Sequence, residues 1–291
     1  MTQHSRRQFL ATLGVGALGL AGINAASSCA SSGAGAAAGS RKLKTIGIQL
    51  YTARNMMQQD MPGTLAQVAA AGYKEVEFAG YFGRTADQVR QLLAQNGLTS
   101  PSSHLQFDPF GGDPSAVLAF AKAIGNEWGV VPYIPEERRK TMDDWKRITD
   151  RLNAIGAQAK SQGLRLGYHN HNFELADMGG GQRPLDYMLK NTDPSLVDFE
   201  MDLYWVVFGG GQPIDFFNRY PGRFPMVHVK DSAGPPDNKM ADVGQGTINF
   251  PAIFALSEKA GIKHYFVERD DTTDAVVTMR NSAQYLLNLT Y

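Results

Sequence analysis

Residues 163–169 read Gly163-Leu164-Arg165-Leu166-Gly167-Tyr168-His169, and they follow a long helical pattern over 142–162. The apolar residues within 164–169 form the short run that is typical of a buried strand. Gly163 stands between the two patterns, at the place where glycine commonly closes a helix. The stretch therefore predicts a helix, a glycine cap and a strand, which together form the αβ connection of a βα repeat.

The same unit recurs along the chain from residue 42 onward. Gly72, Gly97 and Gly261 each separate a helical pattern from a short apolar run. The patterns predict strands over 45–50, 75–78, 98–103, 128–133, 164–169, 197–201, 226–230 and 264–268. They predict helices over 65–71, 86–96, 114–124, 142–162, 250–260 and 274–289, with a short helix over 185–190 and a long polar loop over 232–246.

Eight such strands close into a barrel, so the expected fold is α/β, a single (β/α)8 TIM barrel over residues 41–291. The length of this body, about 250 residues, is the usual size of one such barrel. An open doubly wound sheet is the alternative. Residues 50–54, which follow the first strand, lack the glycine-rich phosphate turn that such a sheet commonly carries there.

Composition narrows the classes of function. The chain carries 28 Lys+Arg against 28 Asp+Glu, so it lacks the basic field that a nucleic-acid partner requires. Its single cysteine, Cys29, precedes the predicted barrel, so the body has neither a disulfide nor a thiolate ligand. A metal in the body would have to be held by His, Asp, Glu or Asn.

The first forty residues resemble an export signal. Ser5-Arg6-Arg7-Gln8-Phe9-Leu10 is followed by an apolar, Gly/Ala-rich run to residue 23 and a stretch of small residues to 39. We expect residues 1–40 to be a twin-arginine-type signal peptide and flexible linker that directs the protein to the periplasm; an ordinary signal or tail is the alternative. Cys29 follows Ala26-Ser27-Ser28, which loosely resembles a lipoprotein processing box without its usual leucine, so a lipid anchor at Cys29 stays open.

Polar side chains of the kind that bind metals stand at the carboxyl ends of the last four predicted strands, which converge on one mouth of a barrel. They are His169, His171, Glu174, Asp202, His228 and Glu268. This mixture of imidazoles and carboxylates suits one divalent ion such as Mn, Zn, Mg or Co. The alternative is a set of unrelated polar residues at strand ends.

The stretch Tyr168-His169-Asn170-His171-Asn172-Phe173-Glu174 resembles the Tyr-His-Asn-His-x-x-Glu signature of a subgroup of the xylose isomerase-like TIM barrels, commonly called sugar phosphate isomerases/epimerases. Asp202 in Met-Asp-Leu-Tyr-Trp, His228 in His-Val-Lys-Asp and Glu268 in Val-Glu-Arg-Asp match the later motifs, and the resemblance extends from about residue 44 to the end. It implies one divalent metal held by Glu174, Asp202, His228 and Glu268. Many relatives have Glu where this chain has His169, so His169 is the alternative first ligand.

The resemblance also implies an isomerase or epimerase that abstracts a proton next to the carbonyl of a sugar or keto-sugar, through a metal-stabilised enediolate. Candidate catalytic residues are His171 as general base, Glu268 and Glu174 as other bases, and Lys230 as a neutralising cation. The residues expected to bind substrate are His104, His169, Tyr51 and Trp205.

Other functions stay open at this point. A lyase or dehydratase acting on a keto-sugar or 3-keto-glycoside would share the same first step. A non-catalytic sugar-binding protein and an apurinic-site endonuclease are further alternatives. The expected partner is a small carbohydrate rather than nucleic acid, export favours an unphosphorylated one, and a homo-oligomer is left open.

Overall fold

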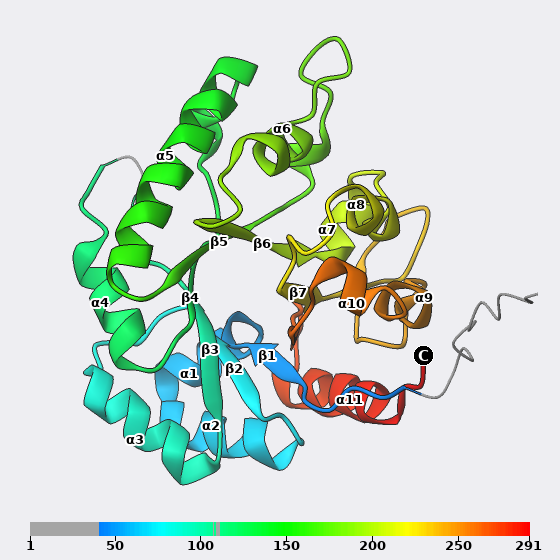
Figure 1. Ribbon diagram of the computed structural model, residues 1–291. Helices are drawn as coiled ribbons and strands as arrows, with labels where there is room; N and C mark the ends of the chain where they lie inside the picture. Colours follow the sequence, from blue (N-terminus) through cyan, green and yellow to red (C-terminus); the bar gives the residue numbers. More distant parts are fainter. Residues whose placement is uncertain (1–40, 107, 109–110) are drawn as a thin grey trace, which may run out of the picture. The chain divides into compact units, whose positions relative to one another are not determined.

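Residues 41–106, 108 and 111–291 are described by a computed structural model, shown in Figure 1. The expectations for Arg6, Arg7 and Cys29 lie outside the described residues. In the described part of the chain, eight parallel strands close into a barrel in the order β1-β10-β7-β6-β5-β4-β3-β2. They are β1 (Gly47–Gln49), β2 (Glu75–Phe78), β3 (Thr99–His104), β4 (Trp128–Val131), β5 (Arg165–His169), β6 (Val197–Asp202), β7 (Met226–Val229) and β10 (His264–Val267). The predicted barrel is confirmed, and the open sheet is excluded.

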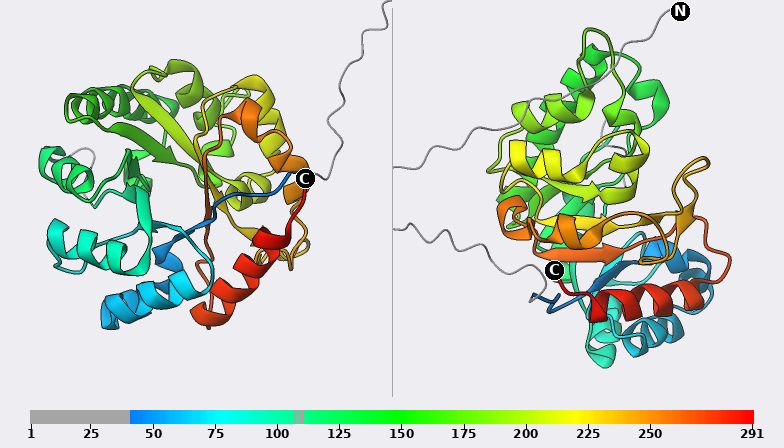
Figure 2. Two further views of the ribbon diagram at one scale, coloured as in Figure 1. Left: turned by 60° about the horizontal axis from the view of Figure 1, so that its bottom comes forward. Right: turned by 90° about the vertical axis from the view of Figure 1, so that its right-hand side faces the viewer.

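Helices surround the barrel on the outside in both views of Figure 2. Those that match predicted helices are α2 (Met61–Ala70), α3 (Ala86–Asn96), α4 (Ser115–Ala123), α5 (Met142–Ser161), α6 (Pro184–Asn191), α9 (Phe250–Phe254), α10 (Ser257–Ala260) and α11 (Ala275–Asn288). Short helices that the sequence patterns did not predict are α1 (Arg54–Gln59), α7 (Leu203–Phe208) and α8 (Pro213–Arg219). No helix among the described residues is long and apolar enough to span a bilayer.

Local sequence sets the ends of these helices. Thr141 caps α5 through a reciprocal pair of hydrogen bonds with Asp144, the capping box of a strong helix start. Trp145, Ile148, Leu152 and Ile155 recur at helical spacing and are buried, so α5 packs one apolar face against the barrel.

The loop predicted over 232–246 contains a small hairpin. Strands β8 (Asp231–Ser232) and β9 (Met240–Ala241) pair antiparallel, with Asp231 opposite Ala241. The buried carboxylate of Asp231 accepts hydrogen bonds from the backbone N–H groups of Gly244, Gly246 and Ile248 at 2.9, 2.9 and 3.1 Å. One side chain thus organises the segment after β7.

The interior of the barrel changes character along its axis. Toward the amino ends of the strands it is filled by a small apolar cluster of Trp128, Val130, Met226 and Phe266. Gly47 makes room for Phe266, because a Cβ atom there would lie 2.5 Å from its Cδ1 atom. Toward the carboxyl ends the interior is filled by buried polar side chains, which form the candidate site.

Candidate metal centre

Side chains from six of the barrel strands point to the axis near the carboxyl ends. They are Gln49 on β1, Glu77 on β2, His104 on β3, His169 on β5, Glu200 and Asp202 on β6 and His228 on β7, and all are buried. Glu200 and Asp202 face the same way because they are two residues apart on a strand. Lys230 and Glu268, which directly follow β7 and β10, complete the group and are also buried.

The layer nearest the mouth joins His169, Asp202, His228 and Glu268. Each of these residues offers one nitrogen or oxygen, and the four atoms lie within 4.8 Å of one another. Nδ1 of His228 lies 2.7 Å from Oε2 of Glu268, and Nε2 of His169 lies 3.8 Å from Oδ2 of Asp202. Polar residues from the ends of the last four predicted strands therefore lie close together in the structure, as predicted.

Lys230 lies beside this layer. Its Nζ atom is 2.8 Å from Oε2 of Glu268, 3.1 Å from Oδ2 of Asp202 and 3.0 Å from Oδ2 of Asp270. Three carboxylates thus surround one ammonium group, as expected for a lysine that neutralises acidic groups at the site.

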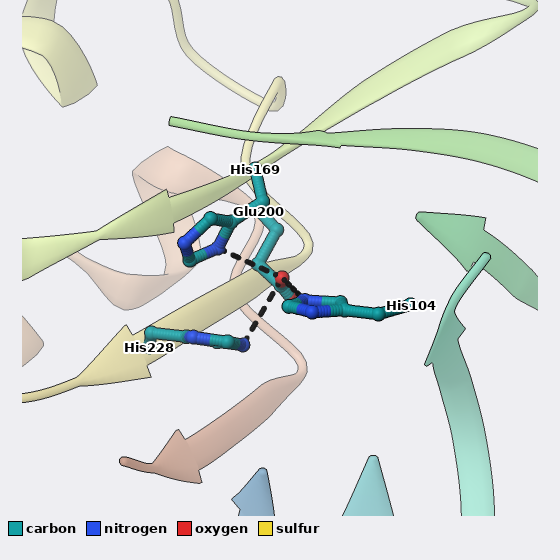
Figure 3. A group of neighbouring side chains, drawn as sticks. All are labelled: His104, His169, Glu200 and His228. Atoms are coloured by element: carbon teal, nitrogen blue, oxygen red, sulfur yellow. Dashed lines mark hydrogen bonds and ion pairs between the residues drawn. The ribbon is translucent and has the colours of Figure 1, made fainter. Parts of the chain in front are cut away.

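A second layer lies deeper in the barrel, around the carboxylates of Glu200 and Glu77. Oε2 of Glu200 is 3.0 Å from Nε2 of His104, 3.1 Å from Nδ1 of His169 and 3.0 Å from Nε2 of His228, as Figure 3 shows. Oε2 of Glu77 is 2.7 Å from Nε2 of His228.

Burial and charge act against each other on these groups. Burial lowers the pKa of His228, but the charges of Glu200 and Glu268 outweigh it and raise that pKa well above its usual value. Burial likewise raises the pKa of Glu268, but Lys230 and His228 outweigh it and hold that carboxyl well below its usual range. For His169, burial and the neighbouring His228 lower the pKa to about 4.

The donor set fits a divalent ion. Oδ2 of Asp202 is buried and has no hydrogen-bond partner among the described residues, and its ion-pair neighbours are Lys230 and His169. Two imidazole nitrogens and two carboxylate oxygens are ligands that Zn, Mn and Co accept. The residues His169, Asp202, His228 and Glu268 therefore suit such an ion.

A cavity of about 390 Å³ adjoins this group at His169 and Glu268, and its volume is in the range of small-molecule sites. Its lining residues include Tyr51, His104, Gln106, Tyr133, His169, His171, Lys230, Glu268 and Asp270. The expected substrate contacts Tyr51, His104 and His169 thus border the cavity. Trp205 stands behind His171, with 5.7 Å between ring centroids, and does not border it.

His171 is fixed by aromatic neighbours on this rim. Its ring stacks on Phe173 with an interplanar angle of 7° and meets the edge of Tyr133, at centroid distances of 5.3 and 5.4 Å. Burial and the nearby His169 lower the pKa of His171 well below its usual value. The neutral imidazole is therefore the favoured form.

The structure places Glu174 differently from the expectation that it serves as first ligand. Its Oε1 accepts a hydrogen bond from the hydroxyl of Tyr168 at 2.6 Å, and its Oε2 accepts one from the backbone N–H of His171 at 2.8 Å. The 3₁₀ turn Phe173–Leu175 directs the carboxyl back to its own strand instead of to the barrel axis. His169, the alternative first ligand, occupies the position beside Asp202, and Glu174 braces the strand end.

Sequence reasoning missed Glu77, Glu200, Gln49 and Asp270. Glu200 precedes Asp202 by two residues and Asp270 follows Glu268 by two, so strand alternation was the signal that could have found both. Glu77 and Gln49 lie on strands whose ends carried no metal-binding motif. His264, at the amino end of β10, lies away from the site and pairs with Glu75 at 2.9 Å.

Comparison with known proteins identifies the family to which this chain belongs. Residues 65–286 match the xylose isomerase-like TIM barrel family, and the chain belongs to it, as the strand-five motif indicated. A sugar phosphate isomerase/epimerase from Parabacteroides distasonis is similar in structure, with a TM-score of 0.74 and 30% identity over 85% of this chain and 99% of that one.

Two further relatives differ in the chemistry that their names state. An inosose dehydratase from Geobacillus thermodenitrificans is 24% identical over 262 residues, which cover 77% of this chain and 85% of the relative. The structure of an L-ribulose 3-epimerase shares the fold at a TM-score of 0.60 and 16% identity, over 83% of this chain and 93% of that one. Proteins similar to this chain thus include some named as dehydratases and some named as isomerases or epimerases.

Proposed function

We propose that this chain is a divalent-metal-dependent enzyme that removes a proton from the carbon next to a carbonyl group of a sugar or keto-sugar. The observation that carries the proposal is the meeting of His169, Asp202, His228 and Glu268, two of which, His169 and Glu268, border a cavity of about 390 Å³. A non-catalytic sugar-binding protein would have no need for two imidazoles and two carboxylates within 4.8 Å of one another.

A divalent ion held by these four residues would supply Lewis acidity, polarising the substrate carbonyl and stabilising negative charge on its oxygen. His171 is our candidate to accept the proton, because its side chain borders the cavity and its buried Nδ1 atom has no hydrogen-bond partner among the described residues. General-base help of this kind contributes roughly 100- to 10,000-fold in rate. Lys230 borders the same cavity, where its positive charge lies near the place at which a substrate oxygen would gain negative charge.

The charge of the cavity supports an uncharged substrate. Asp202, Glu268 and Asp270 already surround Lys230, and no arginine borders the cavity among the described residues. A phosphate group is usually held by arginine, lysine or a helix N-terminus. We therefore propose an unphosphorylated sugar or keto-sugar.

After proton removal, isomerisation or epimerisation returns the proton, whereas a lyase expels an oxygen substituent from the next carbon. We propose an isomerase or epimerase. The lyase is the second candidate, and the curated relatives named inosose dehydratase are the specific observation that favours it.

The experiment is incubation in deuterium oxide with Mn²⁺ and a panel of ketoses, inososes and 3-keto-glycosides, each with its phosphorylated counterpart where one exists. Mass spectrometry measures deuterium incorporation, and product analysis separates isomer or epimer from dehydrated product. We expect exchange with at least one uncharged substrate and no exchange after treatment with a chelator. Absence of exchange across the panel, or cleavage of an abasic oligonucleotide instead, would reject the proposal.

We also propose that the protein is exported through its twin-arginine segment, which is supported by Arg6 and Arg7 followed by Phe9 and Leu10. Replacing both arginines by lysine should keep the protein inside the cell, since the pair is the feature that such export reads. Immunoblots of periplasmic and cytoplasmic fractions measure this. Equal periplasmic amounts of wild type and variant would contradict it.

A further inference from the structure

The carboxylate of Glu200 contacts three imidazoles through a single oxygen atom. It is completely buried on β6, and its Oε2 atom lies 3.0–3.1 Å from one ring nitrogen each of His104, His169 and His228. Figure 3 shows the three rings converging on this oxygen from three strands. Glu200 precedes Asp202 by two residues on β6 and does not line the cavity that Glu268 and His171 border.

This contact determines which nitrogen of each ring is left for a metal. An ionised carboxylate only accepts hydrogen bonds, so the facing Nδ1 of His169 and Nε2 of His228 must carry the hydrogens. Three ring nitrogens lie within 3.1 Å of this one oxygen, an arrangement that suits a hydrogen-bond acceptor. The opposite nitrogens, Nε2 of His169 and Nδ1 of His228, then face Asp202 and Glu268.

We propose that Glu200 is a positioning residue of the metal centre, which sets the tautomer and ring orientation of both histidine ligands; the proposal rests on the proposed function. Glu77 assists at one ring, because its Oε2 lies 2.7 Å from Nε2 of His228 and itself accepts a hydrogen bond from Gln49 at 2.7 Å. Carboxylates that accept from a ligating histidine commonly change metal affinity by 10- to 100-fold.

The alternative use of the same residues is a second ion site, because His104, His169, Glu200 and His228 also offer atoms within 4.8 Å of one another. A second ion there would require His169 and His228 to bind metals through both ring nitrogens at once, and so to lose both hydrogens. The orienting role needs only the neutral ring. Metal stoichiometry separates the two.

The test uses Co²⁺ as the probe and compares Glu200→Gln with Asp198→Asn in the whole chain. Asp198 is a matched control, since it is a buried carboxylate on the same face of β6, but it pairs with Trp128 and Arg165 at the other end of the strand. Competition with a chromophoric chelator gives affinity, elemental analysis gives stoichiometry, visible absorption reports the geometry around cobalt, and circular dichroism reports folding.

We expect wild type to bind one Co²⁺ and E200Q to bind 10- to 100-fold more weakly with an altered cobalt spectrum, because the neutral amide oxygen of glutamine is a weaker acceptor than the carboxylate oxygen that the three rings contact. D198N should keep the wild-type affinity and spectrum. Binding by E200Q within twofold of wild type, with the same spectrum, would overturn the proposal. So would two Co²⁺ in wild type and one in E200Q, which would make Glu200 a ligand.

Two further outcomes are decisive. If E200Q does not fold, the Co²⁺ affinity of Glu77→Gln is measured instead. Weaker binding by E77Q supports the proposal that these carboxylates position the histidine ligands, and unchanged binding overturns it. If wild type binds no Co²⁺, both the proposed function and this inference are rejected. If wild type and E200Q bind Co²⁺ equally well, only this inference is rejected.

Discussion

His171 combines a position on the cavity rim with a ring nitrogen that no described side chain engages. Replacing it by asparagine removes the proposed base but leaves its backbone hydrogen bond to Glu174 in place. We expect kcat to fall by roughly 100- to 10,000-fold while metal content stays the same. Steady-state kinetics and elemental analysis measure both.

The control for this variant is His264→Asn, a histidine change at the amino end of β10, which should leave kcat within about twofold of wild type. If H171N kept most of its activity, the proton would have to be taken by another group, with Glu268 as the nearest candidate from the sequence.

Glu174 makes stability depend on pH. Burial raises the pKa of this carboxyl to about 7, so the folded protein holds its proton at pH values where the unfolded chain has lost it. Wild type should therefore lose stability relative to Glu174→Gln as pH rises from about 4.5 to 7, by about 1.4 kcal/mol per pH unit, and level off above.

Urea unfolding of wild type and E174Q at pH 5, 6, 7 and 8 measures the difference in free energy of unfolding. A difference that stays constant across the series would show that Glu174 is ionised throughout. Asp186→Asn, on the partly exposed face of α6, serves as a control for any general effect of a removed carboxyl.

For individual residues, the sequence identified those that carry a recognisable motif and missed those that do not. Asp202, His228 and Glu268 were found because each follows or ends an apolar run in a familiar pattern. Glu200 lies inside such a run and carries no motif of its own, although in the structure it is buried and contacts three imidazoles. The fold of Glu174 away from the axis depends on a 3₁₀ turn that no spacing rule predicts.

Among the elements, the segment after β7 depends on Asp231. In Asp231→Asn the side-chain nitrogen would replace one oxygen and face backbone donors, so about two hydrogen bonds would be lost. We expect the free energy of unfolding to fall by about 2–4 kcal/mol, because buried N–H groups left without an acceptor are costly. Urea unfolding measures this, and limited proteolysis of the segment should become faster.

Asp237→Asn is the matched control in the same segment. Asp237 is largely exposed and its contact with Lys239 is a surface pair of 3.7 Å, which contributes little. Its removal should change the unfolding free energy by less than about 0.5 kcal/mol. Equal effects of D231N and D237N would show that Asp231 does not organise the segment.

The long elements were predictable and the short ones were not. The helix predicted over 142–162 is found as α5, because twenty residues display the helical period many times. Helices α7 and α8 have six and seven residues, so their pattern completes barely two turns, and α7 begins at Leu203, directly after the site residue Asp202 that caps it. The helix predicted over 250–260 divides at residues 255–256 into α9 and α10.

For the whole molecule, closure of the barrel is what assembles the centre. His169, Asp202, His228 and Glu268 come from β5, β6 and β7 and from the end of β10, and register places Asp202 beside His228. The ring also closes at its ends, where the backbone of Arg41 pairs with that of Tyr291 at 3.0 and 3.1 Å. A ligand held by four segments from the second half of the ring can therefore stabilise the fold as a unit.

This coupling predicts that metal loading raises the melting temperature. An ion that binds only the folded chain adds about 2.7 kcal/mol at a free concentration 100 times its Kd, which is worth roughly 5–10 °C for a chain of this size. Calorimetry of chelator-treated protein, before and after addition of Mn²⁺ or Zn²⁺, measures the shift. Asp202→Asn removes a proposed ligand and should abolish most of the rise in melting temperature. Asp198→Asn should lower the melting temperature of the metal-free protein but keep the rise that follows addition of the metal. A wild-type melting temperature that does not respond to any divalent ion would mean that the folded barrel holds no metal, and the four residues would then owe their proximity to ion pairs with one another and with Lys230.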